Sequence, residues 1–119
     1  MASQESRLVI EQDDEITRIA FLDRNILEEA SIQQIGEEVG AIIDASPSPK
    51  ILLNFENVEH LSSAALGTLI TINNAVKKQG GQLRLAHIDP QIYEVFVITK
   101  LNKLFQIHDD NAAALASFK

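Results

Sequence analysis

Two adjacent serines, Ser62 and Ser63, are the residues of this sequence whose type and position could carry chemistry. They lie in the segment 57–67, between an apolar run that predicts a buried strand and a pattern that predicts a regular helix. Ligand and partner sites in open α/β sheets tend to lie at the carboxyl ends of strands. Two interpretations stay open: a hydroxyl can cap the helix by accepting a backbone N–H, or it can carry a phosphate that the positive end of the helix stabilises.

The other residue types that could carry chemistry form no comparable pattern. The three histidines, His60, His87 and His108, lie in separate loops or strand ends, and none has a histidine four residues away, as a helical zinc site would. The run 108–110 has metal-ligand types, but a helix cap explains its aspartates better. Neither serine sits in a Gly-x-Ser-x-Gly elbow, and the glycine pair 80–81 follows a helix instead of preceding one. The sequence therefore predicts no catalytic, cofactor or metal site, and an enzyme or direct nucleotide binder is the least supported alternative.

The amino-acid composition excludes several further classes of function. Ten Lys and Arg against 17 Asp and Glu give a net charge of −7 over 119 residues, which argues against nucleic-acid binding. The absence of cysteine excludes disulfides, thiolate zinc sites and a cysteine nucleophile. Residues 1–11 lack the apolar core of a secretion signal, and no stretch approaches the roughly 20 apolar residues of a membrane span. We therefore expect a cytoplasmic protein without membrane insertion.

The hydropathy pattern predicts the elements that position the serines. We expect a hairpin from two strands within 8–21, a loop at 23–25, and a helix from residue 28 that ends at Ser46–Pro49. A central strand at 51–55 and a connecting loop at 56–61 precede a helix from Ser62 or Ser63 to Gln79. A half-buried strand at 82–85, a helix from Asp89–Pro90, a strand at 104–107 and a terminal helix after Asp110 complete the order. In the helix after Pro90, the inner face is predicted to comprise Ile92, Val95, Phe96 and Thr99.

Strands that alternate with helices predict an α/β fold. We expect a mixed, mostly parallel sheet of about four to five strands with about four helices. The length fits one domain over residues 8–119, which holds enough apolar residues, at 45% hydrophobic, to bury a core. Residues 1–7 are polar and are predicted to be a loose N-terminus.

Three segments give the chain a resemblance to a known family. They are 51–58 (Ile-Leu-Leu-Asn-Phe-Glu-Asn-Val), 61–67 (Leu-Ser-Ser-Ala-Ala-Leu-Gly), and 80–85 taken with 98–105 and the 110–115 tail. Together they resemble the STAS domain family, specifically the small anti-sigma factor antagonists of bacteria, from about Leu8 to Phe118. The segment 61–67 is similar to a signature that usually reads Asp-Ser-Ser-Gly-Leu-Gly or Asp-Ser-Thr-Gly-Leu-Gly.

The resemblance sets a register through Leu66–Gly67. The family's aspartate then falls on Ser62 and its phosphorylated serine on Ser63. Its second Ser or Thr falls on Ala64 and its glycine on Ala65. The acceptor position is thus kept, while its flanking residues differ, so Ser62 competes with Ser63 for the assignment.

The resemblance implies a partner-switching regulator without an active site. Such a protein binds an anti-sigma factor of the ATPase-type serine kinase class, is phosphorylated by it, and is reset by a serine phosphatase. ATP and magnesium belong to the kinase, so the chain itself is expected to need no cofactor. The implied interface includes Glu59, His60, Ser62, Ser63 and Leu66. The alternative is a STAS scaffold that is not phosphorylated, as a subunit of a signalling or lipid-transport assembly.

Overall fold

The structure is a computed structural model that describes residues 8–13 and 15–118. The predicted loose segment 1–7 lies outside the described residues. The strands are β1 (Leu8–Asp13), β2 (Ile16–Phe21), β3 (Asn25–Ile26), β4 (Lys50–Asn54), β5 (His60–Leu61), β6 (Gln82–Ala86) and β7 (Gln106–His108). The helices are α1 (Glu29–Asp44), α2 (Ser63–Lys78), α3 (Pro90–Ile98) and α4 (Asn111–Ser117), with a 3₁₀ turn, η1, at Leu101–Lys103.

A five-stranded sheet in the order β1-β2-β4-β6-β7 forms the centre of the fold. The hairpin pair β1–β2 is antiparallel, and the pairs β2–β4, β4–β6 and β6–β7 are parallel. Leu53 on β4 pairs with Ile19 on one side and Leu85 on the other, so the three most buried strands share one register. The predicted mixed, mostly parallel α/β sheet with four helices is confirmed.

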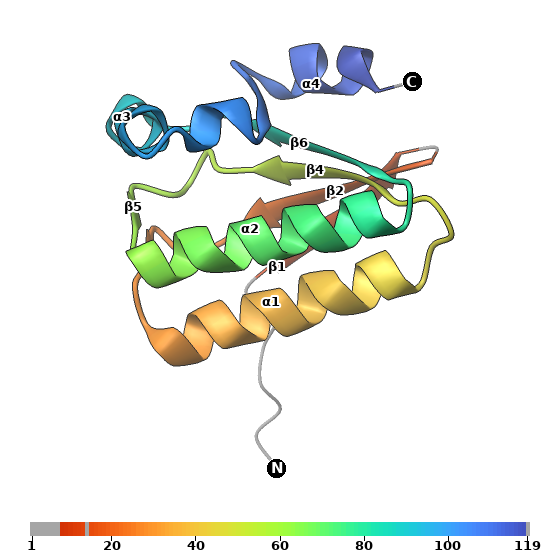
Figure 1. Cartoon of the computed structure of the whole chain (residues 1–119), viewed down its shortest axis with the longest axis horizontal. Helices are drawn as coiled ribbons and strands as arrows, with labels where there is room; N and C mark the ends of the chain where they lie inside the picture. Colours follow the sequence, from red (N-terminus) through yellow and green to blue (C-terminus); the bar gives the residue numbers. More distant parts are fainter. Residues whose placement is uncertain (1–7, 14, 119) are drawn as a thin grey trace.

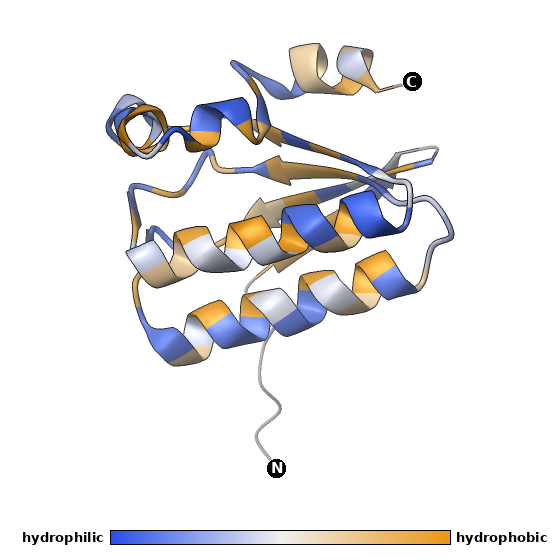
Figure 2. Ribbon diagram, viewed as in Figure 1, coloured by the Kyte–Doolittle hydropathy of each residue, from blue (hydrophilic) through white to orange (hydrophobic). Residues whose placement is uncertain are grey.

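Helices cover the two faces of the sheet unequally. The long helices α1 and α2 lie side by side over one face, and the short α4 lies on the opposite side (Figure 1). Apolar residues of both long helices face the strands, and the hydropathy view shows the resulting alternation along each helix (Figure 2). The main core includes Ile35, Val39, Leu69 and Val76 from these helices, as their spacing predicts.

Two short features differ from the predicted elements. Asn25–Ile26 and His60–Leu61 pair in parallel as a separate two-stranded sheet, although Asn25 and both residues of the second pair were expected in loops and Ile26 in no element. A two-residue strand is too short to show alternation of apolar and polar residues, so the hydropathy pattern could not predict it. The last strand begins at Gln106 and not at Leu104, because Phe105 turns inward against Phe96, with ring centroids 5.7 Å apart.

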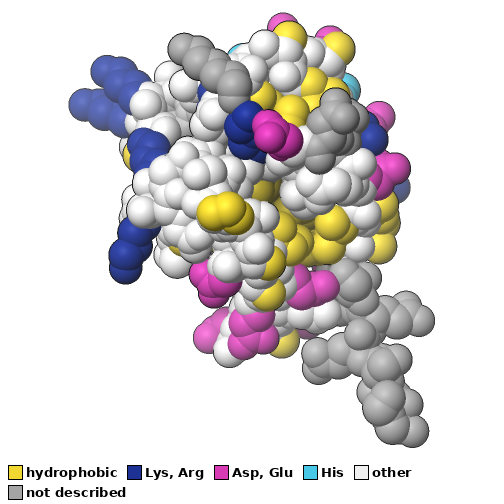
Figure 3. Space-filling model, turned by 90° about the vertical axis from the view of Figure 1, so that its right-hand side faces the viewer, with side chains coloured by type: hydrophobic (Ala, Val, Ile, Leu, Met, Phe, Trp, Pro, Cys, Tyr) yellow, Lys and Arg dark blue, Asp and Glu magenta, His cyan; other side chains and the backbone are white. Residues whose placement is uncertain are grey.

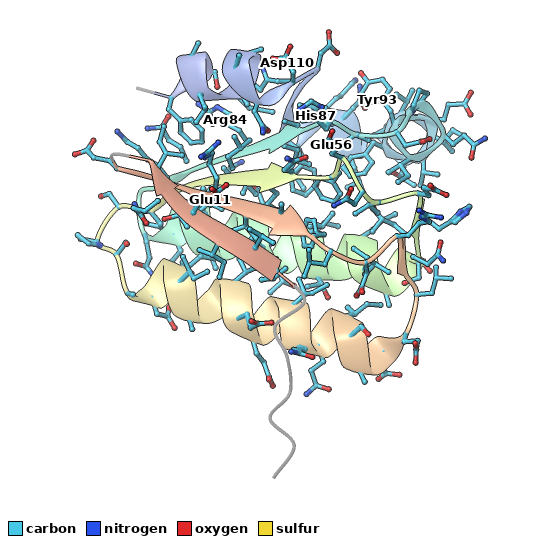
Figure 4. All side chains as sticks on the ribbon, turned by 180° about the vertical axis from the view of Figure 1, so that it is seen from behind. Glu11, Glu56, Arg84, His87, Tyr93 and Asp110 are labelled. Atoms are coloured by element: carbon cyan, nitrogen blue, oxygen red, sulfur yellow. The ribbon has the colours of Figure 1, made fainter. Side chains whose placement is uncertain are left out.

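Burial differs from expectation at three positions. Val95 is 41% exposed and Thr99 is exposed, so the inner face of α3 is narrower than predicted and rests on Ile92 and Phe96. Arg84, expected on the polar face of a half-buried strand, is only 7% exposed. The reason is that α4 covers this part of the sheet, and the Arg84 guanidinium donates to Ser117 Oγ at 2.8 Å (Figure 4).

Candidate functional site

The start of α2 is fixed by a serine cap. Ser62 has extended backbone angles (φ −80°, ψ 165°), and its Oγ accepts the Ala65 backbone N–H at 3.1 Å. The Ser62 carbonyl accepts the Leu66 N–H at 3.1 Å, which is the first bond of the helix. The capping interpretation of Ser62 thus matches the structure, and this half-buried hydroxyl is already engaged.

Ser63 occupies the first helical position and is exposed. Its hydroxyl has no hydrogen-bond partner among the residues that the structure describes, and neither serine is bonded to a histidine there. The first backbone N–H groups of the helix have no intrahelical acceptor, and the Ser62 side chain accepts only that of Ala65. The N–H groups of Ser63 and Ala64 therefore lack a protein acceptor within the described chain. An exposed hydroxyl thus lies beside two free donors at the positive end of a 16-residue helix.

The segment before α2 is held by backbone bonds to the chain that leads into α1. The Arg24 carbonyl accepts the N–H of Glu59 at 2.7 Å and that of His60 at 3.2 Å, and the Ile26 carbonyl accepts the Ser62 N–H at 3.1 Å. The same two segments are also joined by an exposed ion pair, in which Arg24 Nε lies 3.4 Å from Glu59 Oε2. These bonds fix the entry of the chain into α2, whereas the exposed ion pair adds less than about 1 kcal/mol.

An open groove of about 340 Å³ runs between β5, the first turn of α2, and α3. Of the residues predicted for the interface, Glu59, His60 and Leu66 line it. Ser62 and Ser63, also predicted for the interface, are not part of its lining. Ser63 precedes Leu66 by three residues, a spacing that makes the two side chains neighbours on a helix surface. The groove and the exposed serine therefore form one continuous surface.

Five further residues line the groove but were not predicted from the sequence to belong to an interface. They are Leu27, Leu61, Gln91, Ile92 and Val95. Leu27 is 53% exposed and Val95 is 41% exposed, so the groove presents apolar side chains to solvent. A signal for α3 was present, since the segment 92–98 holds more apolar residues than one buried helix face can take. No signal marked Leu27, because a single exposed leucine is ordinary.

The described residues contain no cluster of three or more His, Cys, Asp or Glu side chains that could hold a metal ion. The one acidic run that suggested such a site is a cap, as predicted: Asp110 Oδ1 accepts the Ala113 N–H at 2.8 Å (Figure 4). Within the same part of the chain, no helix combines the length and the apolar character that crossing a bilayer requires.

Comparison with known proteins identifies the fold and its family. The model of the STAS domain family matches residues 8–114, which is most of the chain. This chain belongs to the STAS domain family. Among relatives of this STAS domain is BtrV of Bordetella bronchiseptica, named as an anti-sigma factor antagonist. It is 25% identical over 96 residues, which cover 81% of this chain and 82% of BtrV.

Solved structures share the fold of this STAS domain. An anti-sigma factor antagonist domain protein from Planctomyces limnophilus superposes with a TM-score of 0.84 at 20% identity, over 92% of this chain and 96% of that chain. The Bacillus protein SpoIIAA in its phosphorylated form superposes with a TM-score of 0.67 at 18% identity, over 89% and 95% of the two chains. At these identities the likeness concerns the fold, and the predicted STAS architecture is confirmed.

Proposed function

We propose that this STAS domain is a non-catalytic partner-switching regulator that binds an anti-sigma factor and is controlled by phosphorylation of Ser63. Its relatives support the class, since BtrV is named as an anti-sigma factor antagonist and SpoIIAA was solved in a phosphorylated form. The single observation that carries the proposal is the position of Ser63. It is exposed and first in α2, its hydroxyl bonds to none of the described residues, and it lies one helical turn before Leu66 of the groove.

The partner surface comprises Glu59, His60, Ser62, Ser63 and Leu66. The groove supplies an apolar floor through Leu66, which is 8% exposed, and a polar rim through Glu59 and His60. Burial of the exposed groove residues against a partner would contribute roughly 25 cal/mol per Å² of apolar surface. The polar rim would orient the partner more than it strengthens the complex.

Phosphorylation at Ser63 changes the charge of this surface and leaves its packing intact. A phosphoserine adds about −1.5 to −2 charges at pH 7. The free N–H groups of Ser63 and Ala64 can accept that charge, so the helix need not unfold. The same charge would lie beside Leu66. An acidic partner surface would be repelled there, and an apolar partner surface would have to desolvate the phosphate.

The partner we infer is an anti-sigma factor of the ATPase-type serine kinase class. It would bind the unphosphorylated domain, phosphorylate Ser63 and then release the domain. A serine phosphatase would reverse the modification. ATP and magnesium would belong to the kinase, and this chain would supply only the acceptor hydroxyl and the docking surface.

Mass-spectrometric mapping after incubation with such a kinase and ATP tests the acceptor. We expect the phosphate on Ser63 and none on the S63A variant, whereas S62A remains a substrate. A phosphate on Ser62 alone would reassign the switch to that residue. The absence of any phosphate on either serine would remove the switch from the proposal.

Affinity measurement tests the consequence of the charge. Ser63→Asp should weaken binding of the anti-sigma factor by calorimetry, whereas Ser48→Asp, which adds the same charge at an exposed site between α1 and β4, should leave it unchanged. The altered signature, with Ser62 in place of the family's aspartate, favours one alternative: a STAS scaffold that is not phosphorylated. Equal affinity of S63D and the unmodified protein would support that alternative.

A further inference from the structure

A second groove, far from Ser63, gathers basic side chains. It has a volume of about 570 Å³ and lies where α2 ends, between β6, η1 and the C-terminal end of α4. Its lining holds Lys77, Arg84 and Lys103 and contains no Asp or Glu. Three of the chain's ten basic residues thus share one groove in a protein of net charge −7. On the face shown in Figure 3, most Lys and Arg side chains likewise gather along one edge, apart from most of the acidic ones.

Arg84 is buried, and no carboxylate among residues 8–13 and 15–118 pairs with it. Its guanidinium donates to Ser117 Oγ, the Leu83 carbonyl, Gln82 Oε1 and the Ser117 carbonyl. A guanidinium has five N–H donors, so the four acceptors that the described residues provide leave one donor, on Nη1, unused. Burial lowers the pKa of Arg84 from its ordinary value, because desolvation disfavours the charged form. An anion in the groove would compensate this buried charge.

Asn73 provides a second unused donor. It is 3% exposed, it lines the same groove, and its buried Nδ2 atom has no hydrogen-bond partner in the described part of the chain. An unsatisfied buried amide costs about 1–3 kcal/mol, and buried polar groups in proteins are nearly always paired. Its unpaired state in the basic groove indicates a missing acceptor.

We propose that this groove binds a phosphate group of a small molecule. The amide of Asn73, the free Nη1 donor of Arg84 and the ammonium groups of Lys77 and Lys103 come from α2, β6 and η1. A phosphate group, with up to two negative charges and three acceptor oxygens, matches these three cationic side chains and one amide better than a carboxylate, which brings one charge and two oxygens. Leu83, Leu104 and Phe105 also line the groove and would contact the apolar part of the ligand. The groove volume lies in the range of small-molecule sites.

The site is independent of the proposed switch. Lys77 follows Ser63 by 14 residues of α2, which corresponds to about 21 Å along the helix. That distance exceeds the screening length of about 8 Å at physiological ionic strength. Loss of anion binding would therefore leave the Ser63 proposal untouched, and the reverse also holds.

Titration of the folded chain with inorganic pyrophosphate, followed by amide chemical shifts at constant ionic strength, tests the proposal. We expect saturable shifts at groove residues such as Asn73, Leu83 and Gln106. Lys77→Gln and Lys103→Gln should each weaken binding by roughly tenfold, the usual loss for one charge-assisted hydrogen bond. The control Lys78→Gln removes the same charge from the adjacent residue, which does not line the groove, and should change the affinity less than about twofold.

Three outcomes would overturn the proposal. They are shifts that do not saturate, shifts spread over the surface instead of the groove, and equal losses in Lys77→Gln and Lys78→Gln. A further titration with vesicles of anionic phospholipid distinguishes the source of the phosphate. Groove shifts with pyrophosphate and none with vesicles support a free small molecule. Shifts with vesicles alone reject it in favour of a membrane surface.

Discussion

Replacement of Ser62 by alanine should lower the free energy of unfolding by about 1 kcal/mol, whereas Ser63→Ala should change it by less than about 0.5 kcal/mol. The difference comes from one hydrogen bond. Ser62 Oγ accepts the Ala65 N–H at 3.1 Å, and the half-buried site limits how well water can replace it. The Ser63 hydroxyl makes no such bond, and alanine is the better helix former at its position.

Urea unfolding followed by far-UV circular dichroism measures both variants. The chain has no tryptophan, so the backbone signal is a better probe than fluorescence. A loss of about 1 kcal/mol corresponds to a fall in Tm of roughly 3–6 °C for a chain of this length. The slope of the unfolding free energy against urea should stay the same, because neither change alters the surface exposed on unfolding.

Ser62→Asp is the matched control for the cap. An aspartate caps a helix about as well as a serine and adds favourable charge at the positive end. S62D should therefore retain the stability of the unmodified protein to within about 0.5 kcal/mol. Equal losses in S62A and S63A, or a loss in S62D as large as that in S62A, would refute the separation of roles between the two serines.

Three further substitutions test other parts of the structure, each by urea unfolding. Gly81→Ala should cost at least about 2 kcal/mol, because its Cβ would overlap the carbonyl oxygen of Pro49; a smaller loss would mean that this contact relaxes. Lys100→Gly should add about 1 kcal/mol, since Lys100 has a left-handed backbone (φ 64°) that glycine adopts without strain, and unchanged stability would contradict that cost. Gly67→Ala should add about 0.5–1 kcal/mol, because its Cβ meets nothing within 4 Å. Gly67 is exposed one turn after Ser63, so the same variant should weaken partner binding by calorimetry, and unchanged affinity would place the partner on another face.

The long elements were predictable because their patterns are long. Helix α2 shows a repeated apolar spacing over 16 residues, and Ser62 stands where a cap is favoured, so both its face and its start followed from the sequence. The central strand β4 followed in the same way from its continuous apolar run. The sequence thus located the start of α2 to within one residue, at Ser62 or Ser63, while it left capping and phosphorylation both open.

The rest depends on contacts between distant segments. The pairing of Asn25–Ile26 with His60–Leu61 joins residues 35 positions apart, and each strand is too short to carry a period. Arg84 looked like an outward residue, since only the packing of α4 against the sheet buries it. Val95 looked like a core residue until the position of α3 left it in the groove. These are tertiary effects that override a local pattern.

In the proposed function, the start of α2 assigns the structural role to Ser62 and the signalling role to Ser63. Ser62 and the carbonyl groups of Arg24 and Ile26 fix the helix start through bonds that do not involve the Ser63 side chain. A charge placed on Ser63 therefore has no internal bond to break, and its effect must be exerted on whatever lies against the surface. Screening limits that effect to about 8 Å at physiological ionic strength, a distance that includes the neighbouring Leu66 and the adjoining groove. A switch of this kind needs no second conformation of the domain, because the free energy of release comes from desolvation and repulsion at the interface itself.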